Sequence, residues 1–308
     1  MGLNQDPLNL RKDLRVCSFN TRTLKTSWRL EEACFLASKR KIDILCVQEH
    51  RIRVPASAET TPYQRSLEGG WLFCHASARQ DLAHGGVGVL LSPKLAPLLE
   101  GQPVVISERI MQLKLRASPG SELHVICCYA PTAGADEAKK EEFYGKLDNL
   151  LDDIPPDKTF IVCGDFNATL VDRIPHVNCL PGDAPNDNTE IFTEFLLRRG
   201  LRPANFYQQP RRNAKLHTFT SHNGTRQVCL DYLYRPGGSD PSGRLRYCTA
   251  LASSSPTIDP FSPTSAFVFG GPGTILRRSI FTTGRASLTP LLTNFSSKLF
   301  PHIWLVHI

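Results

Sequence analysis

Residues 161–170, IVCGDFNATL, place a carboxylate and an amide at the end of an apolar segment. Three apolar residues lead to Gly164, and Asp165 and Asn167 follow with one residue between them. In extended backbone this spacing puts both side chains on one face of a strand. An ionised carboxylate at the rim of a core needs a partner. The chemistry of this segment therefore depends on what Asp165 binds.

Other apolar segments of the chain also end in polar residues. These are Asn20, the pair Gln48 and Glu49, and Tyr129, while Asp231 lies within CLDYLY. Strand ends at one edge of packed sheets can converge on a single cleft, and these carboxylates and amides would make it rich in hard oxygen atoms. Mg²⁺ and Mn²⁺ prefer such ligands. We expect the partner of Asp165 to be such a metal ion or a water molecule bound to it.

Strands and helices that could position these residues follow from the pattern of apolar residues. Residues 27–41, 135–154 and 189–201 have the helical period. Strands are predicted at 14–20, 42–49, 85–93, 108–117, 122–132 and 158–168, with a hairpin formed by 216–221 and 227–235. Strands outnumber helices, which favours two packed sheets with helices outside.

Composition sets limits on the class of protein. The 308 residues carry a formal net charge of +7, with a pI near 8.9, which allows a polyanionic partner such as nucleic acid. Cys46, Cys127, Cys128 and Cys163 lie in apolar segments and no C-x-x-C pair occurs, so we expect buried thiols in a reducing compartment. The sequence has no signal peptide and no apolar stretch that could span a membrane. We expect an intracellular protein, nuclear or cytoplasmic and not secreted, that is monomeric and has no contact with membranes.

The segments SFNTRTL, VQEHR, YAPT, GDFNA and LDYLY, in this order, resemble the endonuclease/exonuclease/phosphatase superfamily. They look most like the apurinic/apyrimidinic-endonuclease-like domain of non-LTR retrotransposons and the related craniofacial-development-protein-like genes. The resemblance covers about residues 12–250. It implies an α/β (α+β) fold, a deoxyribonuclease-I-like four-layer sandwich of two packed β-sheets flanked by helices. It also implies metal-dependent cleavage of phosphodiesters, and hence a Mg²⁺- or Mn²⁺-dependent endonuclease of retrotransposon origin acting on DNA.

The resemblance assigns a role to each matching position. Glu49 matches the metal-binding glutamate, and Asp165, which could also contact the metal, would position or deprotonate the attacking water. The family's cleft asparagine, its active-site tyrosine and its phosphate-orienting asparagine match Asn20, Tyr129 and Asn167. Asp231 matches the carboxylate that supports the catalytic histidine.

One part of the family pattern is missing. The family ends with an Asp-His dipeptide followed by a strand, and this chain contains no Asp-His. From Leu251 onward only one acidic residue occurs, Asp259, so the composition changes at this point. We divide the chain into an N-terminal tail at 1–12, the superfamily domain at 13–250 and an atypical segment at 251–308. That segment is interpreted as frame-shifted near Ser255–Ile258, or as a disordered tail, so the last strand and the catalytic histidine are expected to be absent.

Basic residues near the predicted cleft leave the substrate class open. Arg22, Arg51 and Arg53 accompany the first two motifs, and Arg211 and Arg212 lie in QQPRRNAKLHTFTS, where they could contact DNA phosphates. The alternatives are a phosphodiesterase of the same superfamily acting on RNA, a phospholipid or an inositol phosphate, and a non-catalytic relic that binds nucleic acid.

Overall fold

Two β-sheets form the centre of the protein. The structure is a computed structural model that describes residue 8 and residues 14–54, 62–78, 85–117, 122–170, 184–203, 218–220, 227–236, 250–251 and 302–303. One sheet has the strand order β1-β2-β5-β4-β3 and the other β10-β13-β9-β8-β7-β6. The strands of the first are β1 Val16–Asn20, β2 Ile44–Gln48, β3 Tyr63–Ser66, β4 Leu72–His75 and β5 Val87–Leu91. Those of the second are β6 Leu99–Ser107, β7 Ile110–Arg116, β8 Glu122–Tyr129, β9 Thr159–Asp165, β10 Leu201–Pro203 and β13 Asp231–Pro236.

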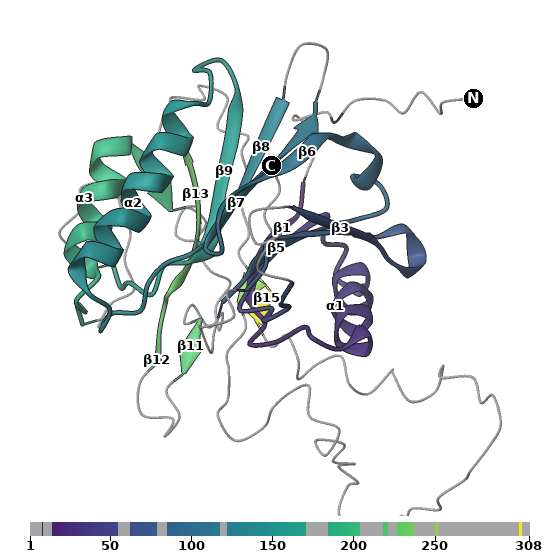
Figure 1. Ribbon diagram of the computed structural model, residues 1–308, viewed down its shortest axis with the longest axis horizontal. Coiled ribbons are helices and arrows are strands. Elements are labelled where there is room, and N and C mark those ends of the chain that lie inside the picture. Colours follow the sequence, from purple (N-terminus) through teal and green to yellow (C-terminus); the bar gives the residue numbers. More distant parts are fainter. Residues whose placement is uncertain are drawn as a thin grey trace, which may run out of the picture.

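Three helices cover the outer faces of the two sheets. They are α1 Ser27–Lys39, α2 Glu137–Asp152 and α3 Thr189–Arg199. Helices α2 and α3 lie side by side on the six-stranded sheet, and α1 lies against the five-stranded sheet (Figure 1). The predicted four-layer sandwich is thus confirmed.

Shorter elements complete the description. Two of them are single 3₁₀ turns, at Glu68–Gly70 and Ala96–Leu98. Strand β11 (Phe219–Thr220) pairs with β12 (Gln227–Val228), and β14 (Ala250–Leu251) pairs with β15 (His302–Ile303). The first of these pairs is the predicted hairpin, which leads into β13.

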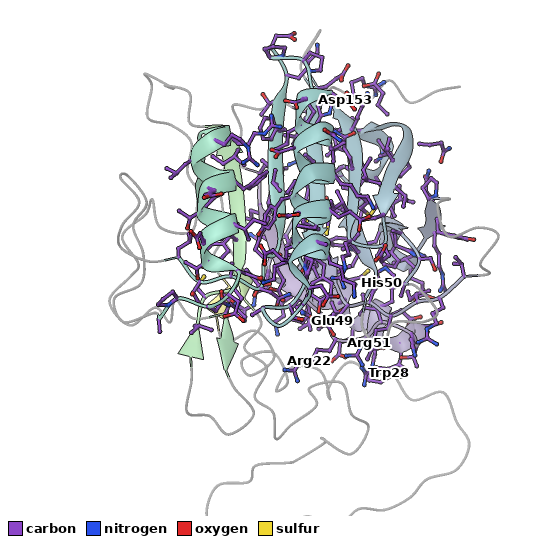
Figure 2. All side chains as sticks on the ribbon, turned by 60° about the vertical axis from the view of Figure 1, so that its left-hand side comes forward. Arg22, Trp28, Glu49, His50, Arg51 and Asp153 are labelled. Carbon is purple, nitrogen blue, oxygen red and sulfur yellow. The ribbon has the colours of Figure 1, made fainter. Side chains whose placement is uncertain are left out.

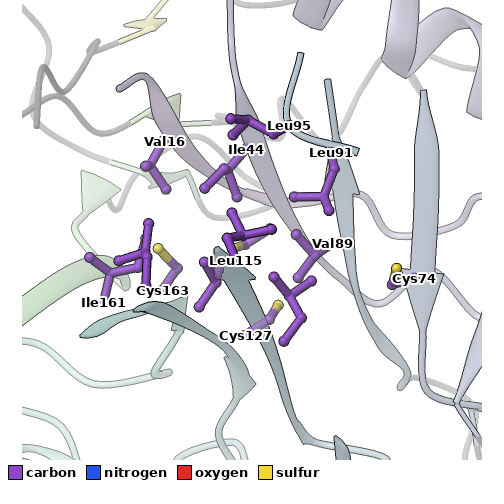
Figure 3. Close-up of a cluster of buried hydrophobic side chains, with 14 of the residues drawn as sticks. Val16, Ile44, Cys74, Val89, Leu91, Leu95, Leu115, Cys127, Ile161 and Cys163 are labelled. Atoms are coloured by element: carbon purple, nitrogen blue, oxygen red, sulfur yellow. The ribbon is translucent and has the colours of Figure 1, made fainter. Parts of the chain in front are cut away.

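The core between the sheets follows from the alternation of side chains along each strand. On β8, Leu123, Val125 and Cys127 face the other sheet, whereas Ile126 and Cys128 face α2 and α3. The inward-facing residues of both sheets meet in one buried cluster (Figure 3). The eight described cysteines are all buried, and Cys46, Cys127, Cys128 and Cys163 are among them, as predicted.

Parallel pairing within each sheet comes from a helical crossover. Strands β1 and β2 are parallel and joined through α1, and β8 and β9 are parallel and joined through α2. The two strands approach closely at Gly164, where an added Cβ would lie 2.2 Å from the carbonyl oxygen of Cys128. Only glycine therefore fits immediately before Asp165.

The sequence missed four strands of the two sheets. Strand β3 is largely exposed, so it lacks the apolar pattern, and β6 contains Gly101 and Pro103, which weaken the strand signal. Strands β4 and β10 are short, with four and three residues. In the predicted N-terminal tail, Leu8 is buried and its N–H donates to the carbonyl of Arg116.

The C-terminal prediction lies mostly outside the described residues. Of residues 251–308 only Leu251, His302 and Ile303 are described. Strand β1 is at one end of the five-stranded sheet, and β14 lies close to it. Among the helices that the structure describes, none is long and apolar enough to cross a membrane.

Candidate functional site

The predicted polar residues gather at one end of the interface between the sheets because strand alternation turns them inward. On β9, Ile161 and Cys163 belong to the core between the sheets, and Asp165 follows with the same period. The strand register then aligns three of them in a row, with Tyr129 opposite Asp165 and Asp165 opposite Asp231. Asn20, at the end of β1 in the other sheet, completes the set.

Asn20 connects the two carboxylates that the sequence selected. Its Nδ2 donates to Oε1 of Glu49 and to Oδ2 of Asp165, at 3.0 Å in each case. Its Oδ1 accepts the backbone N–H of Arg22 at 3.1 Å. The amide oxygen and the amide nitrogen of Asn20 are thereby both held, and this side chain lies between the two sheets.

Glu49 reaches the site through a left-handed turn. It follows Gln48 at the end of β2, and its φ of 52° departs from extended backbone. Its Oε1 accepts the hydroxyl of Tyr129 at 2.8 Å, and its Oε2 accepts Nη2 of Arg51 at 2.9 Å. Burial opposes ionisation, but the hydrogen bonds from Asn20, Arg51 and Tyr129 and the charge of Arg51 outweigh it. The pKa of Glu49 therefore lies below its ordinary value, and the group is a stable carboxylate.

Tyr129 is held by a residue that sequence analysis did not select. The guanidinium of Arg109 lies 5.2 Å from the centre of the tyrosine ring. Its Nη1 also donates to the carbonyls of Tyr129 and Ala130, at 3.2 and 3.3 Å. Burial, followed by the charges of Glu49 and Asp165, raises the pKa of Tyr129 far above its ordinary value. Tyr129 therefore acts as a hydrogen-bond donor. Arg109 was missed because a single arginine in the turn between β6 and β7 gives no signal in the sequence.

The prediction that Asp165 and Asn167 share one face of an extended strand is wrong. Strand β9 ends at Asp165, and Asn167 has a φ of 47° because its N–H turns back to donate to Oδ1 of Asp165 at 2.9 Å. Its Nδ2 donates to the carbonyl of Ala130 at 2.9 Å. Burial and the charge of Glu49 raise the pKa of Asp165 to about 6, against the hydrogen bonds from Asn20 and Asn167.

Asp231 begins β13 and lies directly opposite Asp165. Its backbone N–H donates to Oγ1 of Thr218 at 3.1 Å. Burial, followed by the charges of Asp165 and Glu49, raises the pKa of Asp231 well above its ordinary value, against the hydrogen bond with the Thr218 side chain. A buried carboxyl thus lies beside the predicted catalytic aspartate.

Two asparagines that sequence analysis missed hold the loop of Asn167. Nδ2 of Asn188 donates to the carbonyls of Pro131 and Asn167, at 2.9 and 3.0 Å. Nδ2 of Asn186 donates to the same carbonyl of Asn167 at 2.9 Å. The signal was available as the segment NDN immediately before α3, but its distance along the chain from Asn167 concealed the contact.

His50 fixes the turn that contains Glu49. Its Nδ1 accepts the N–H of Ile52 at 3.0 Å, and its Nε2 lies 3.2 Å from the carbonyl of Val87. Burial, followed by the charge of His75, lowers the pKa of His50 to about 3, so the ring is neutral. The close fit extends to Gly86, where an added Cβ would lie 2.4 Å from the imidazole.

The arginines predicted to contact phosphate differ in position. Arg22 and Arg51 lie at the same end of the molecule as Glu49, whereas Asp153 lies at the opposite end (Figure 2). The side chain of Arg22 is exposed, that of Arg51 pairs with Glu49, and that of Arg53 is exposed. Arg211 and Arg212 lie outside the described residues.

Backbone strain concentrates at this site. Among the described residues, five that are not glycine have a left-handed φ: Arg22, Lys41, Glu49, Arg51 and Asn167. All but Lys41 were selected from the sequence as site residues. A left-handed residue with a side chain costs about 1–2 kcal/mol, and such strain tends to collect at functional sites.

Comparison with known proteins identifies the family. Residues 17–247 match the Endonuclease/Exonuclease/phosphatase family. The chain belongs to this family. Its superfamily assignment from the sequence is therefore confirmed, and the matched range contains Asn20, Glu49, Tyr129, Asp165 and Asp231.

Relatives of this endonuclease/exonuclease/phosphatase chain include craniofacial development protein 2 from Bos taurus, which is 27% identical over 164 residues, or 52% of this chain. A transposon TX1 149 kDa protein from Xenopus laevis is 34% identical over 112 residues, or 36% of this chain. These matches span 27% and 8% of the relatives, so the chain covers at most about a quarter of their length.

Among solved structures, an AP endonuclease from Archaeoglobus fulgidus aligns with a TM-score of 0.55. The alignment covers 96% of this chain and 98% of the neighbour, at 16% sequence identity. At this identity the likeness concerns the fold, and it supports the deoxyribonuclease-I-like sandwich predicted from the sequence.

Proposed function

We propose that this chain is a divalent-metal-dependent phosphodiesterase-type domain and acts on DNA as an endonuclease. One observation carries the proposal: Asn20 bridges Glu49 and Asp165 across the two sheets while Tyr129 donates to the same glutamate. Family membership adds hydrolysis of phosphate esters as the reaction class. The similarity to a transposon protein and to an AP endonuclease supports DNA as the substrate.

The donor chemistry of the site fits Mg²⁺ or Mn²⁺. Oε2 of Glu49 pairs with the positive charge of Arg51 at 2.9 Å, so this oxygen can interact with a cation. Within the described residues no three His, Cys, Asp or Glu side chains are arranged to hold a metal ion. Mg²⁺ commonly binds one or two carboxylates and fills its remaining positions with water and substrate phosphate. Glu49, and secondarily Asp165, would therefore hold it.

Each residue then has a role in phosphodiester hydrolysis. A bound divalent ion neutralises charge on the phosphate oxygens. Asp165, whose carboxylate is fixed by Asn20 and Asn167, orients the attacking water and accepts its proton. The amides of Asn20 and Asn167 stabilise negative charge that develops on the phosphate. Tyr129 orients Glu49, because its hydroxyl donates to that carboxylate.

A test of this proposal is nicking of supercoiled plasmid by the purified 308-residue chain with Mg²⁺. Asp165→Ala and Glu49→Ala are the test variants. Asp153→Ala is the matched control, because Asp153 is exposed at the opposite end of the molecule. We expect nicking that EDTA and both test variants abolish and the control preserves. Nicking that survives in Asp165→Ala would overturn the proposal.

A second candidate is a non-catalytic relic that binds nucleic acid. It is favoured by the absence of Asp-His from the chain and by the position of Asp231, which lies opposite Asp165. Nicking that is absent, and recovers when Asp-His and a final strand are restored, would support this reading. Turnover of RNA or of an inositol phosphate in place of DNA would instead support the other phosphodiesterases of the superfamily.

A further inference from the structure

The two carboxylate oxygens of Glu49 accept hydrogen bonds from different kinds of donor, one neutral and one charged. Oε1 accepts Nδ2 of Asn20 and the hydroxyl of Tyr129, which carry no charge. Oε2 accepts Nη2 of Arg51, which is a cation. The oxygen best suited to a metal ion is therefore the one that already pairs with a positive charge.

The backbone around this ion pair is fixed by hydrogen bonds. The N–H of Arg51 donates to the carbonyl of Gly85 at 3.1 Å, and the carbonyl of His50 accepts the N–H of Leu24 at 2.8 Å. The His50 ring accepts the N–H of Ile52 on the other side. Because the turn is held in this way, the separation of the two charges can change only through their side chains.

The two partners of the ion pair differ in their freedom to leave it. The Arg51 side chain is 27% exposed, and the Glu49 side chain is 13% exposed and holds two further hydrogen bonds. A guanidinium is weakly hydrated and can turn toward solvent or toward a phosphate, which it binds in a bidentate manner. Arg51 is thus the partner that would move.

We propose that Arg51 is an internal counter-ion of Glu49 that competes with the divalent metal for this carboxylate and turns toward substrate phosphate when the metal binds. The proposal rests on the metal dependence proposed above. Two cations at Oε2 repel each other, so metal binding there weakens the pairing with the guanidinium and favours its displacement. Without substrate, the metal consequently binds more weakly than it would if Glu49 had no counter-ion. When a substrate phosphate accepts Arg51, the metal affinity rises.

Direct binding of Mn²⁺ to the full chain without nucleic acid, measured by electron paramagnetic resonance, tests this inference. Arg51→Gln should tighten Mn²⁺ binding about three- to fivefold, because a weak ion pair contributes up to about 1 kcal/mol. Arg51→Lys, which keeps the charge, should remain close to the parent chain. Lys25→Gln removes an exposed cation from the loop before α1 and should change the dissociation constant less than twofold.

The possible outcomes separate this inference from the proposed function. Parent-chain binding that is lost in Glu49→Gln and unchanged or weakened in Arg51→Gln would overturn the inference and leave the metal site standing. Equal tightening in Arg51→Gln and Lys25→Gln would also overturn it, because general charge would then explain the effect. Absence of Mn²⁺ binding in every variant, with circular dichroism confirming that each is folded, would overturn both the metal site and the competition.

Discussion

Asp165 and Asp231 lie directly opposite one another on the antiparallel strands β9 and β13. Both are buried and both have a raised pKa, mainly because burial disfavours the charged form. Like charges on opposite strands destabilise a sheet. The protein therefore keeps a carboxyl pair where two neutral residues would be more stable.

Asp231→Asn should raise the free energy of unfolding at pH 8 by about 1–3 kcal/mol, because it removes a buried carboxylate from this pair. Below about pH 3 the gain should vanish, since the aspartate is then mostly protonated in both the folded and the unfolded state. Urea denaturation at the two pH values measures the difference. Asp153→Asn, on an exposed side chain, serves as the control, and an equal gain at both pH values would refute the explanation.

Two buried tyrosines allow the role of the Tyr129 hydroxyl to be separated from simple packing. Tyr129→Phe removes a donor from Glu49 and should reduce the nicking rate about 10- to 100-fold with little loss of stability. Tyr144 is also buried, and its hydroxyl has no hydrogen-bond partner in the part of the chain that the structure describes. Tyr144→Phe should therefore leave nicking unchanged. Equal effects of the two substitutions in nicking and thermal-unfolding assays would argue against the proposed role.

Acid should destabilise the fold through the buried histidines of β4 and the Glu49 turn. Burial lowers the pKa of His75 to about 4, and its ring stacks on Phe73 and Tyr63. The unfolded state, with its histidine pKa near 6.5, binds more protons between pH 6.5 and pH 4, so stability falls as the pH falls through this range.

His75→Phe keeps the aromatic packing and removes this titration. Between pH 7 and pH 4, the variant should lose less of its unfolding free energy than the parent chain, by on the order of 1–3 kcal/mol. Denaturant titrations across this range provide the measurement. An unchanged slope would show that His75 does not contribute, and would leave His50, whose pKa is also lowered, as the source.

Gly164 supports Asp165 by allowing β8 and β9 to approach. Gly164→Ala places a Cβ against the backbone carbonyl of Cys128, which cannot move without breaking the parallel ladder, so we expect a loss of about 2–4 kcal/mol. Gly145→Ala, within α2 and with open space around it, should instead gain about 0.5–1 kcal/mol. Thermal unfolding of both variants tests the contrast, and a neutral Gly164→Ala would contradict the close approach.

The convergence of the polar strand ends could be predicted from the sequence because strand period and polar strand ends are local signals. Asn20, Tyr129 and Asp165 reach the site simply by continuing the alternation of their strands. Glu49 also joins this cluster, although its side chain arrives through a left-handed turn that no glycine marks.

Contacts between distant segments were beyond this kind of prediction. The extended conformation expected for Asn167 failed because its own N–H returns to Asp165. The support from Arg109 and Asn188 depends on loops that the fold brings together, and neither residue follows a periodic pattern. The strand β3 was missed for a related reason, since an exposed strand has no apolar alternation.

The hydrogen bonds from Asn20 and Tyr129 cross from one sheet to the other, so the distance between the layers sets their length. The side chains that fix that distance are mostly apolar and lie buried between the two sheets. A void or an oversized side chain there would shift one layer against the other and stretch both bonds, although every polar residue of the site was unchanged. The geometry of this polar cluster thus depends in part on the packing of the interior, and hydrostatic pressure, which acts on internal voids, would perturb it.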